Sequence, residues 1–297
     1  MRSLLAHLVV ALIALVAIGG ATRVMEAGLA CPDWPLCYGT LLPGRQMNLQ
    51  VFLEWFHRLD AFLVGLALLV VLAFSLVARA RLPRWFPWAT SLALLLVAAQ
   101  GALGAFTVLH LLEAGTVTAH LVTALLLVLV VSASAEALSA PASSSQPLPP
   151  WWPYVLALAT VLLLTQCALG GAMASRWASS ACLQAGEGCR WLLIHRLGAW
   201  PAMAGLGLLG AAALALPAVH RPLARRALAV SLLVPLQATL GVFTLRLQLS
   251  QPAITVCHQI LAALLVALIG AIWGRTLVAL VSARSMPASP SLEMAHG

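Results

Sequence analysis

Long apolar runs separated by short polar stretches recur along the whole chain. An apolar helix of about 20 residues can cross the hydrocarbon core of a bilayer, and a longer one can tilt or project beyond it. Runs of this length lie at 3–20, 52–78, 85–107, 113–135, 153–173, 191–216, 223–245 and 252–280. The pattern predicts eight transmembrane helices, the first of them an uncleaved helix rather than a signal peptide.

The composition of the 297-residue chain agrees with a lipid environment. Hydrophobic residues make up 62% of the sequence and charged residues only 8%, whereas a soluble domain carries about 25% charged residues. The formal net charge is +8, and every basic residue is an arginine. Because the arginines lie mostly in short loops between apolar runs, topology and membrane lipid explain them, and we expect no nucleic-acid partner.

The distribution of arginines predicts how the helices cross the membrane. With eight spans, nine arginines lie on the side of the amino terminus and five lie on the opposite side. Positive charge is enriched in cytoplasmic loops. We therefore expect both termini to be cytoplasmic.

Four of the six cysteines form two short-range pairs in loops, Cys31 with Cys37 and Cys182 with Cys189. The predicted orientation puts both loops outside, where disulfide bonds form and persist. We expect two disulfide bonds, with a metal site or free thiols as the alternatives.

The sequence contains an internal repeat. The segment IGGA at 18–21 recurs as LGGA at 169–172, and QGALGAFTV at 100–108 recurs as QATLGVFTL at 237–245. We expect an all-α membrane protein built as two homologous four-helix bundles in tandem. The predicted parts are an N-terminal half at 1–135, a cytoplasmic linker at 136–152, a C-terminal half at 153–282 and a disordered tail at 283–297.

Four of the eight histidines belong to the repeat, namely His57, His120, His195 and His258. Each lies five to eight residues into its predicted helix from the outer side, which is about 8–12 Å along the axis. Polar groups at membrane depth are costly and often functional, and helix bundles hold cofactors between facing helices. Two such histidines can fill both axial positions of a heme iron. We expect one heme in each half; simple interhelical hydrogen bonds are the alternative.

The two halves differ beside their first histidine. Glu54 precedes His57 by three residues on the same helix face, and Leu192 occupies the matching position in the second half. A carboxyl group at only one site suggests that this site reacts while the other carries electrons. A rim carboxylate that merely pairs with an arginine is the alternative. Arg58 and Arg196 directly follow two of the histidines and are candidates for contacts with heme propionates.

Two motifs near the first of these histidines carry a family resemblance. One is Thr-Arg-(x)4-Gly-Leu-(x)3-Asp-Trp-Pro at Thr22 to Pro35, and the other is Glu-(x)2-His-Arg at Glu54 to Arg58. Together with the three later histidines, they make the chain similar to the heme A synthase family over essentially its whole length.

The resemblance implies a reaction and a role for each site residue. Heme A synthases oxidise the C8 methyl group of heme O to a formyl group, which gives heme A for terminal oxidases. The substrate heme O would here lie between His57 and His120, with Glu54 as the catalytic carboxylate. A heme b cofactor would lie between His195 and His258. The resemblance also implies a bacterial cytoplasmic (inner) membrane, and it suggests heme O synthase and terminal oxidase assembly factors as partners.

Two other functions use many of the same elements. A non-catalytic di-heme electron carrier of the cytochrome b type needs the four histidines but does not need Glu54. A transporter or assembly scaffold can also be a duplicated bundle, but this sequence lacks the broken helices and midplane charges of transporters. We therefore expect an oxidoreductase, with the electron carrier as the alternative.

Overall fold

The computed structural model describes residues 1–140, 147–175, 184 and 189–284. Within them, eight helices are long and apolar enough to cross a membrane, which confirms an all-α, multi-pass membrane protein. The short helix η2 (Ala218–His220) precedes α8. The eight are α1 (Arg2–Val24), α2 (Leu49–Val77), α3 (Phe86–Leu109), α4 (Ala114–Ser139), α5 (Trp152–Ala174), α7 (Arg190–Leu214), α8 (Arg221–Arg246) and α9 (Pro252–Arg284).

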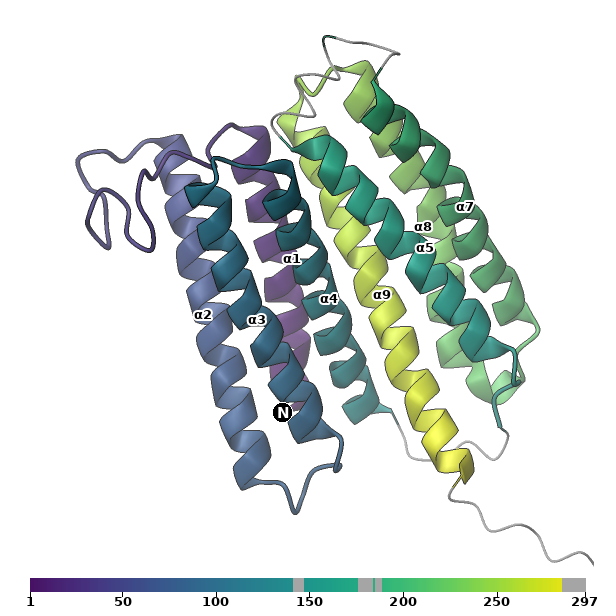
Figure 1. Ribbon diagram of the computed structural model, residues 1–297. Helices are drawn as coiled ribbons and strands as arrows, with labels where there is room; N and C mark the ends of the chain where they lie inside the picture. Colours follow the sequence, from purple (N-terminus) through teal and green to yellow (C-terminus); the bar gives the residue numbers. More distant parts are fainter. Residues whose placement is uncertain (141–146, 176–183, 185–188, 285–297) are drawn as a thin grey trace, which may run out of the picture.

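The long helices lie side by side in two groups of four (Figure 1). One group contains α1 to α4, and the other contains α5, α7, α8 and α9. The segment between α1 and α2 lies at one end of the bundle, which we call the loop end, while the start of α1 and the end of α9 lie at the opposite end. This grouping agrees with two four-helix halves; their origin by duplication stays a prediction.

The two groups meet mainly where α9 packs against α4. A Cβ atom at Gly270 would lie 2.5 Å from the carbonyl oxygen of Leu129, and one at Gly274 would lie 2.2 Å from that of Ala133. Small residues of this kind let the backbones of two membrane helices approach closely. The hydroxyl of Ser132 donates a 2.6 Å hydrogen bond to a carbonyl oxygen of α9. Glycine on α9 therefore sets the distance between the halves.

A carboxylate joins the halves at the end opposite the loop. Glu136 on α4 forms an ion pair of 2.9 Å with Arg226 of α8, and it also accepts a hydrogen bond from Arg275 of α9. Helix α4 continues past Glu136 to Ser139. The first four residues of the expected linker 136–152 are thus helical. Most of the expected tail, from 285 onward, lies outside the described residues.

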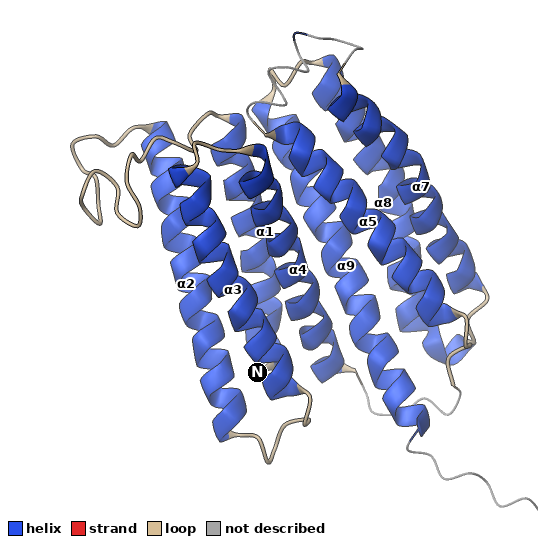
Figure 2. Cartoon of the chain, in the orientation of Figure 1, coloured by secondary structure: helices blue, strands red, loops and turns tan. Residues whose placement is uncertain are grey.

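The described residues contain helices, loops and turns but no β-strand (Figure 2). The apolar contact core runs through both groups and includes Leu68 of α2, Val128 of α4 and Ile269 of α9. Many large apolar side chains on the outer faces remain exposed, as expected for helices that face lipid. The buried core residues therefore fix the position of each helix. The apolar residues on the outer faces suit contact with lipid.

Candidate functional site: a heme-sized cavity with a histidine pair

A large cavity opens among α1, α2, α3 and α4 toward the loop end. Its volume is about 1960 Å³, whereas ordinary ligand pockets have about 300–1,000 Å³. The walls are mostly apolar, and both His57 and His120 line them together with Glu54 and Arg58. The sequence-predicted residues of the first half therefore meet in one cavity.

His57 of α2 and His120 of α4 face each other across this cavity. Their ring centroids are 6.5 Å apart, and the ring planes are inclined by 81°. A metal–imidazole bond is about 2.0–2.1 Å long and the ring centre lies about 1.1 Å beyond the nitrogen, so two axial imidazoles on one metal have centroids about 6.3 Å apart. The Nδ1 atoms of both rings are buried and have no hydrogen-bond partner among the described residues. The pair fits the two axial ligands of a heme iron.

Each of the four repeated histidines packs against a glycine of the preceding helix. The separations between the histidine Cε1 atom and a Cβ built on the glycine are 2.9 Å for Gly19 with His57, 3.5 Å for Gly104 with His120, 3.1 Å for Gly170 with His195, and 3.0 Å for Gly241 with His258. At three of these positions any larger residue would press on the ring. The repeated glycines were visible in the sequence, but only the structure assigns them to the histidines.

The second histidine pair lies in the other group of helices and has polar support. The side-chain amide of Gln166 lies 3.1 Å from Nδ1 of His195 and donates to the carbonyl oxygen of that residue. Nδ1 of His258 lies 3.1 Å from the carbonyl oxygen of Gln237. A hydrogen bond to one ring nitrogen sets the orientation of a metal-binding imidazole. The second pair is thus held more firmly by hydrogen bonds than the first pair.

All four histidines lie at a similar distance from the loop end. They stand five to eight residues after the start of their helices, which is about 8–12 Å along the axes. No group of three or more His, Cys, Asp and Glu side chains in the described residues could hold a metal ion. At this common depth, each pair could supply two ligands to a metal whose remaining ligands come from a macrocycle.

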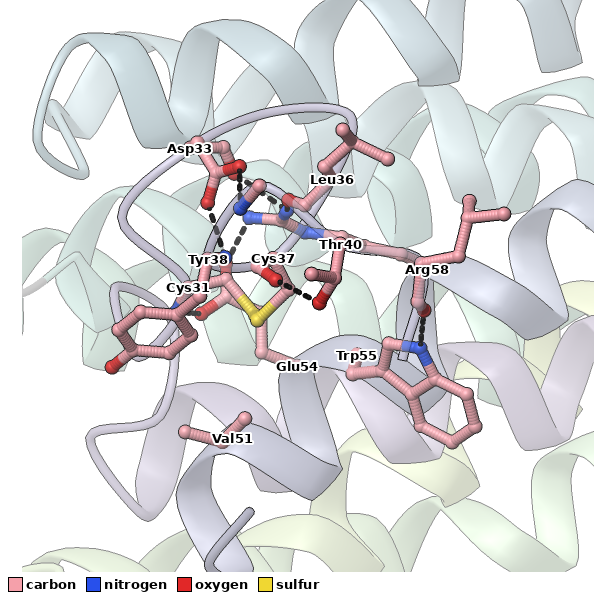
Figure 3. The surroundings of a disulfide bond; sticks show 12 residues. Cys31, Asp33, Leu36, Cys37, Tyr38, Thr40, Val51, Glu54, Trp55 and Arg58 are labelled. Carbon is pink, nitrogen blue, oxygen red and sulfur yellow. Dashed lines mark hydrogen bonds and ion pairs between the residues drawn. A yellow bond between two sulfur atoms is a disulfide. The ribbon is translucent and has the colours of Figure 1, made fainter. Parts of the chain in front are cut away.

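Glu54 and Arg58 form a buried ion pair beside His57. Arg58 Nη2 lies 2.6 Å from Glu54 Oε1, and Glu54 is only 4% exposed. The backbone N–H of Cys31 donates to Glu54 Oε2 at 2.8 Å (Figure 3). From the sequence, a carboxylate that merely pairs with an arginine was the alternative to a catalytic role. The structure shows that the pair exists and that Glu54 also lines the cavity.

Arg58 connects helix α2 to the loop above the cavity. Its Nη1 atom donates to the carbonyl oxygens of Asp33 at 2.7 Å and Leu36 at 2.6 Å. Both Nη atoms are therefore engaged with protein groups, although a propionate contact was expected. The matching arginine of the second half, Arg196, is exposed.

The loop itself, residues 25–48, is braced by a disulfide bond between Cys31 and Cys37, as expected. The carboxylate of Asp33 accepts hydrogen bonds from the backbone N–H groups of Tyr38 and Gly39. These hydrogen bonds, that of Gly39 above all, lower the pKa of Asp33 below its ordinary value. The second expected disulfide includes Cys182, which lies outside the described residues.

Residues of the second half also reach the first cavity, namely Gly171 and Ala174 of α5, Gln248 and Leu249 between α8 and α9, and Gln259 of α9. Gln259 follows His258 on α9 and lines the cavity wall. A Cβ atom at Gly20 would overlap Oε1 of Gln259, so a larger residue at position 20 would displace the amide. This oxygen is buried and has no hydrogen-bond partner among the described residues. No pattern in the sequence identifies Gln259, because its position depends on how the halves pack.

Comparison with known proteins places these features in a family. Residues 2–269 match the family model described as cytochrome oxidase assembly protein (COX15-CtaA). A heme A synthase of Sphingopyxis alaskensis is 29% identical, and the match covers 87% of each chain. A heme A synthase of Erythrobacter litoralis is 27% identical over 86% of this chain and 90% of that protein. One of Shewanella oneidensis is 33% identical over 55% of this chain and only 54% of that protein.

The family model extends from the first residue of α1 into α9, so it spans both histidine pairs and the loop that is braced by Cys31 and Cys37. The chain belongs to the heme A synthase family of cytochrome oxidase assembly proteins.

Proposed function

We propose that the protein oxidises the C8 methyl group of heme O to a formyl group in the cavity between His57 and His120. The observation that carries this proposal is the 6.5 Å separation of the two rings across a cavity of about 1960 Å³. That separation suits axial ligation of one iron, and the volume leaves room for a macrocycle with large substituents. Family membership supports heme O as the substrate.

Glu54 is the proposed catalytic carboxylate. Both of its oxygens accept one hydrogen bond, from Arg58 and from the backbone of Cys31. A carboxylate offers about four acceptor sites, so Glu54 can accept a further hydrogen bond from water or from a hydroxyl group at the reacting carbon. Oxidation of a methyl group releases several protons and electrons, and a fixed carboxylate beside the substrate provides a proton acceptor. The hydrogen bond from Arg58 keeps this carboxylate in position.

His195 and His258 are the proposed ligands of a resident heme b. Their hydrogen bonds to Gln166 and Gln237 support this role, because a permanent cofactor gains from ligands with a fixed orientation. Such a heme supplies one-electron chemistry. The protein sets the distance between the two histidine pairs. It also surrounds the second pair with apolar helices that exclude water.

The remaining sequence predictions complete the proposal. We infer a bacterial cytoplasmic membrane location with both termini in the cytoplasm, so that the loop end faces outward. The two halves are the products of duplication, and the glycine that packs on each histidine recurs in both, which supports a common plan. Heme O synthase and terminal oxidase assembly factors are the proposed partners.

The test is heme extraction and chromatography from cells that make heme O, with and without this protein. Heme A, or its hydroxylated precursor, is expected only in cells with the protein. The variant Glu54→Gln should retain the heme spectrum and lose heme A formation. Glu113→Gln, which changes an exposed carboxylate outside the cavity, is the matched control. Unchanged heme O beside a purified protein with a bis-histidine spectrum would instead identify an electron carrier.

A further inference from the structure

Two contacts between the halves are related by the internal repeat. Gly20 of α1 packs against the side chain of Gln259 on α9. Gly171 of α5 packs against the side chain of Leu121 on α4. The two glycines occupy the same place in the repeated segments IGGA and LGGA, and each partner directly follows the second histidine of its half. Equivalent positions thus make one polar contact and one apolar contact.

The polar contact belongs to the first cavity, because Gln259 lines it. Glu54 lines the same cavity and is matched in the repeat by Leu192. This cavity therefore contains two polar side chains whose repeat-equivalent residues are leucines. A polar group in an apolar wall at membrane depth is costly unless it has a partner. The difference indicates that both residues serve the chemistry of the first cavity.

Two contacts define how α1 lies against α2 beside the cavity. Gly19 packs on the ring of His57. The hydroxyl of Thr22 lies 3.4 Å from the carbonyl oxygen of Leu53. Because Gly20 stands between Gly19 and Thr22 on α1, it lies between the levels of Leu53 and His57 on α2.

The amide of Gln259 therefore lies at a depth similar to that of Glu54. Glu54 stands three residues from His57 on the side of the loop end, which is about 4.5 Å along α2. The level of Gly20, against which the amide packs, falls in the same interval. Since Glu54 is the proposed catalytic carboxylate, the reacting carbon lies at this depth as well. Gln259 can meet a group on that carbon from the side of α9.

The side-chain amide of Gln259 has unused hydrogen-bonding capacity. Its Oε1 atom is buried and has no hydrogen-bond partner among the described residues. An amide offers two acceptor positions on oxygen and two donor hydrogens on nitrogen. The last torsion of a glutamine side chain is broad, so either end of the amide can turn toward a ligand. A methyl group on the ligand gives the amide no partner, whereas a hydroxyl group can both donate and accept.

We propose that the amide of Gln259 binds the hydroxyl group of the alcohol that lies between the C8 methyl group and the formyl group, and thereby retains this intermediate in the cavity. This inference rests on the proposed function, because oxidation of a methyl group to a formyl group passes through the alcohol. A site built to bind a hydroxyl group disfavours the analogue that lacks it, since its own polar groups are then left unpaired. Gln259 thus favours the intermediate over the substrate.

The proposed site for the alcohol is shared between the halves. Helix α2 supplies the carboxylate of Glu54, and helix α9 supplies the amide of Gln259. The first half alone therefore provides the histidine pair but lacks one of the polar groups that meet the intermediate. This gives the second half a part in substrate binding besides its proposed heme b.

The experiment compares two ligands that differ by one oxygen atom. Purified protein that retains its resident heme is titrated with heme O and, separately, with the C8 hydroxymethyl derivative of heme O, and binding is followed by the low-spin heme spectrum. Gln259→Leu removes the amide and copies Leu121, the residue at the equivalent contact. The preference for the hydroxymethyl derivative over heme O should fall by about 2- to 12-fold, as expected for the loss of one hydrogen bond. A variant that only disturbs packing would weaken both ligands equally.

Two further variants keep the result interpretable. Gln259→Met keeps an unbranched side chain of similar length without the amide, and it should lower the preference in the same way. Gln251→Leu is the matched control, because it makes the same substitution at an exposed residue that does not line the cavity, and it should keep the native preference. An unchanged preference in Gln259→Leu and Gln259→Met, or an equal fall in Gln251→Leu, would overturn the inference. The titration requires no turnover, so a protein that binds both ligands but forms no heme A would refute the proposed function alone.

Discussion

The contact between Gly19 and His57 makes a sharp prediction for Gly19→Ala. The added Cβ atom would lie 2.9 Å from Cε1 of the His57 ring, whereas carbon atoms pack at about 3.5–4.0 Å. The ring must therefore move by about 0.6–1 Å, which exceeds the tolerance of about 0.2 Å for a metal–ligand distance. Since the ring is the end of a side chain, the displacement affects ligation more than folding.

The magnitude follows from the cost of such overpacking. Inserting a methyl group into a packed site costs about 1–3 kcal/mol, which corresponds to a 5- to 150-fold loss of affinity for the heme in the first half. The assay is a spectral titration of purified protein with heme O, with the resident heme spectrum as the check on folding. The expected result is weaker binding at the first pair and an unchanged second pair.

Gly104→Ala is the matched control on the opposite side of the same cavity. Its Cβ atom would lie 3.5 Å from Cε1 of His120, an ordinary van der Waals contact, so its affinity should match that of the native protein. If Gly19→Ala and Gly104→Ala weaken heme binding equally, or if neither does, the contact argument is refuted.

Three further predictions concern the loop and the contact between halves. Arg58→Met should release the loop 25–48 and leave Glu54 buried without its partner, which should destabilise the protein by about 3–5 kcal/mol. Faster proteolysis of the loop would confirm the prediction, and a native cleavage rate would contradict it. Because the pKa of Asp33 is lowered in the folded loop, its contribution to loop order is complete above pH 3.8 and is lost as the pH falls through the folded pKa. Proteolysis of the loop should therefore become faster at low pH. Asp33→Asn should flatten this pH dependence, and an unaltered pH profile would refute the assignment. Glu136→Gln should lower the melting temperature and keep both heme spectra, whereas a native melting temperature would mean that the ion pairs contribute nothing.

The sequence predicted those features that depend on position along a single helix. The eight spans followed from the length of apolar runs, and the common depth of the histidines followed from counting residues from each helix start. The approach of His57 to His120 also followed, because equal depth on two helices of one four-helix bundle leaves few other arrangements. The length of each apolar run predicts a span, and the helical rise per residue predicts the depth of each histidine.

Features that depend on loop backbone or on packing between halves were not predictable. Glu54 bonds to Arg58, as an i, i+4 pair suggests, but its second oxygen accepts from the backbone of Cys31, and Arg58 donates to two loop carbonyl groups. No residue type signals these contacts, since any residue supplies the same backbone atoms. The helical start of the expected linker had a similar cause, because the ion pairs of Glu136 form only when α8 and α9 are in place.

The amide of Gln259 over Gly20 has a consequence for electron tunnelling. Gln259 is bonded to His258, and Gly20 is bonded to Gly19, which packs on the ring of His57. Two pairs of peptide-bonded neighbours and two van der Waals contacts thus link a histidine of one pair to a histidine of the other. Electron tunnelling weakens steeply across gaps between atoms. With hemes at both pairs, as proposed above, this continuous contact favours direct electron transfer between them over a diffusing carrier. The contact between Gln259 and the backbone at position 20 is possible because Gly20 has no side chain.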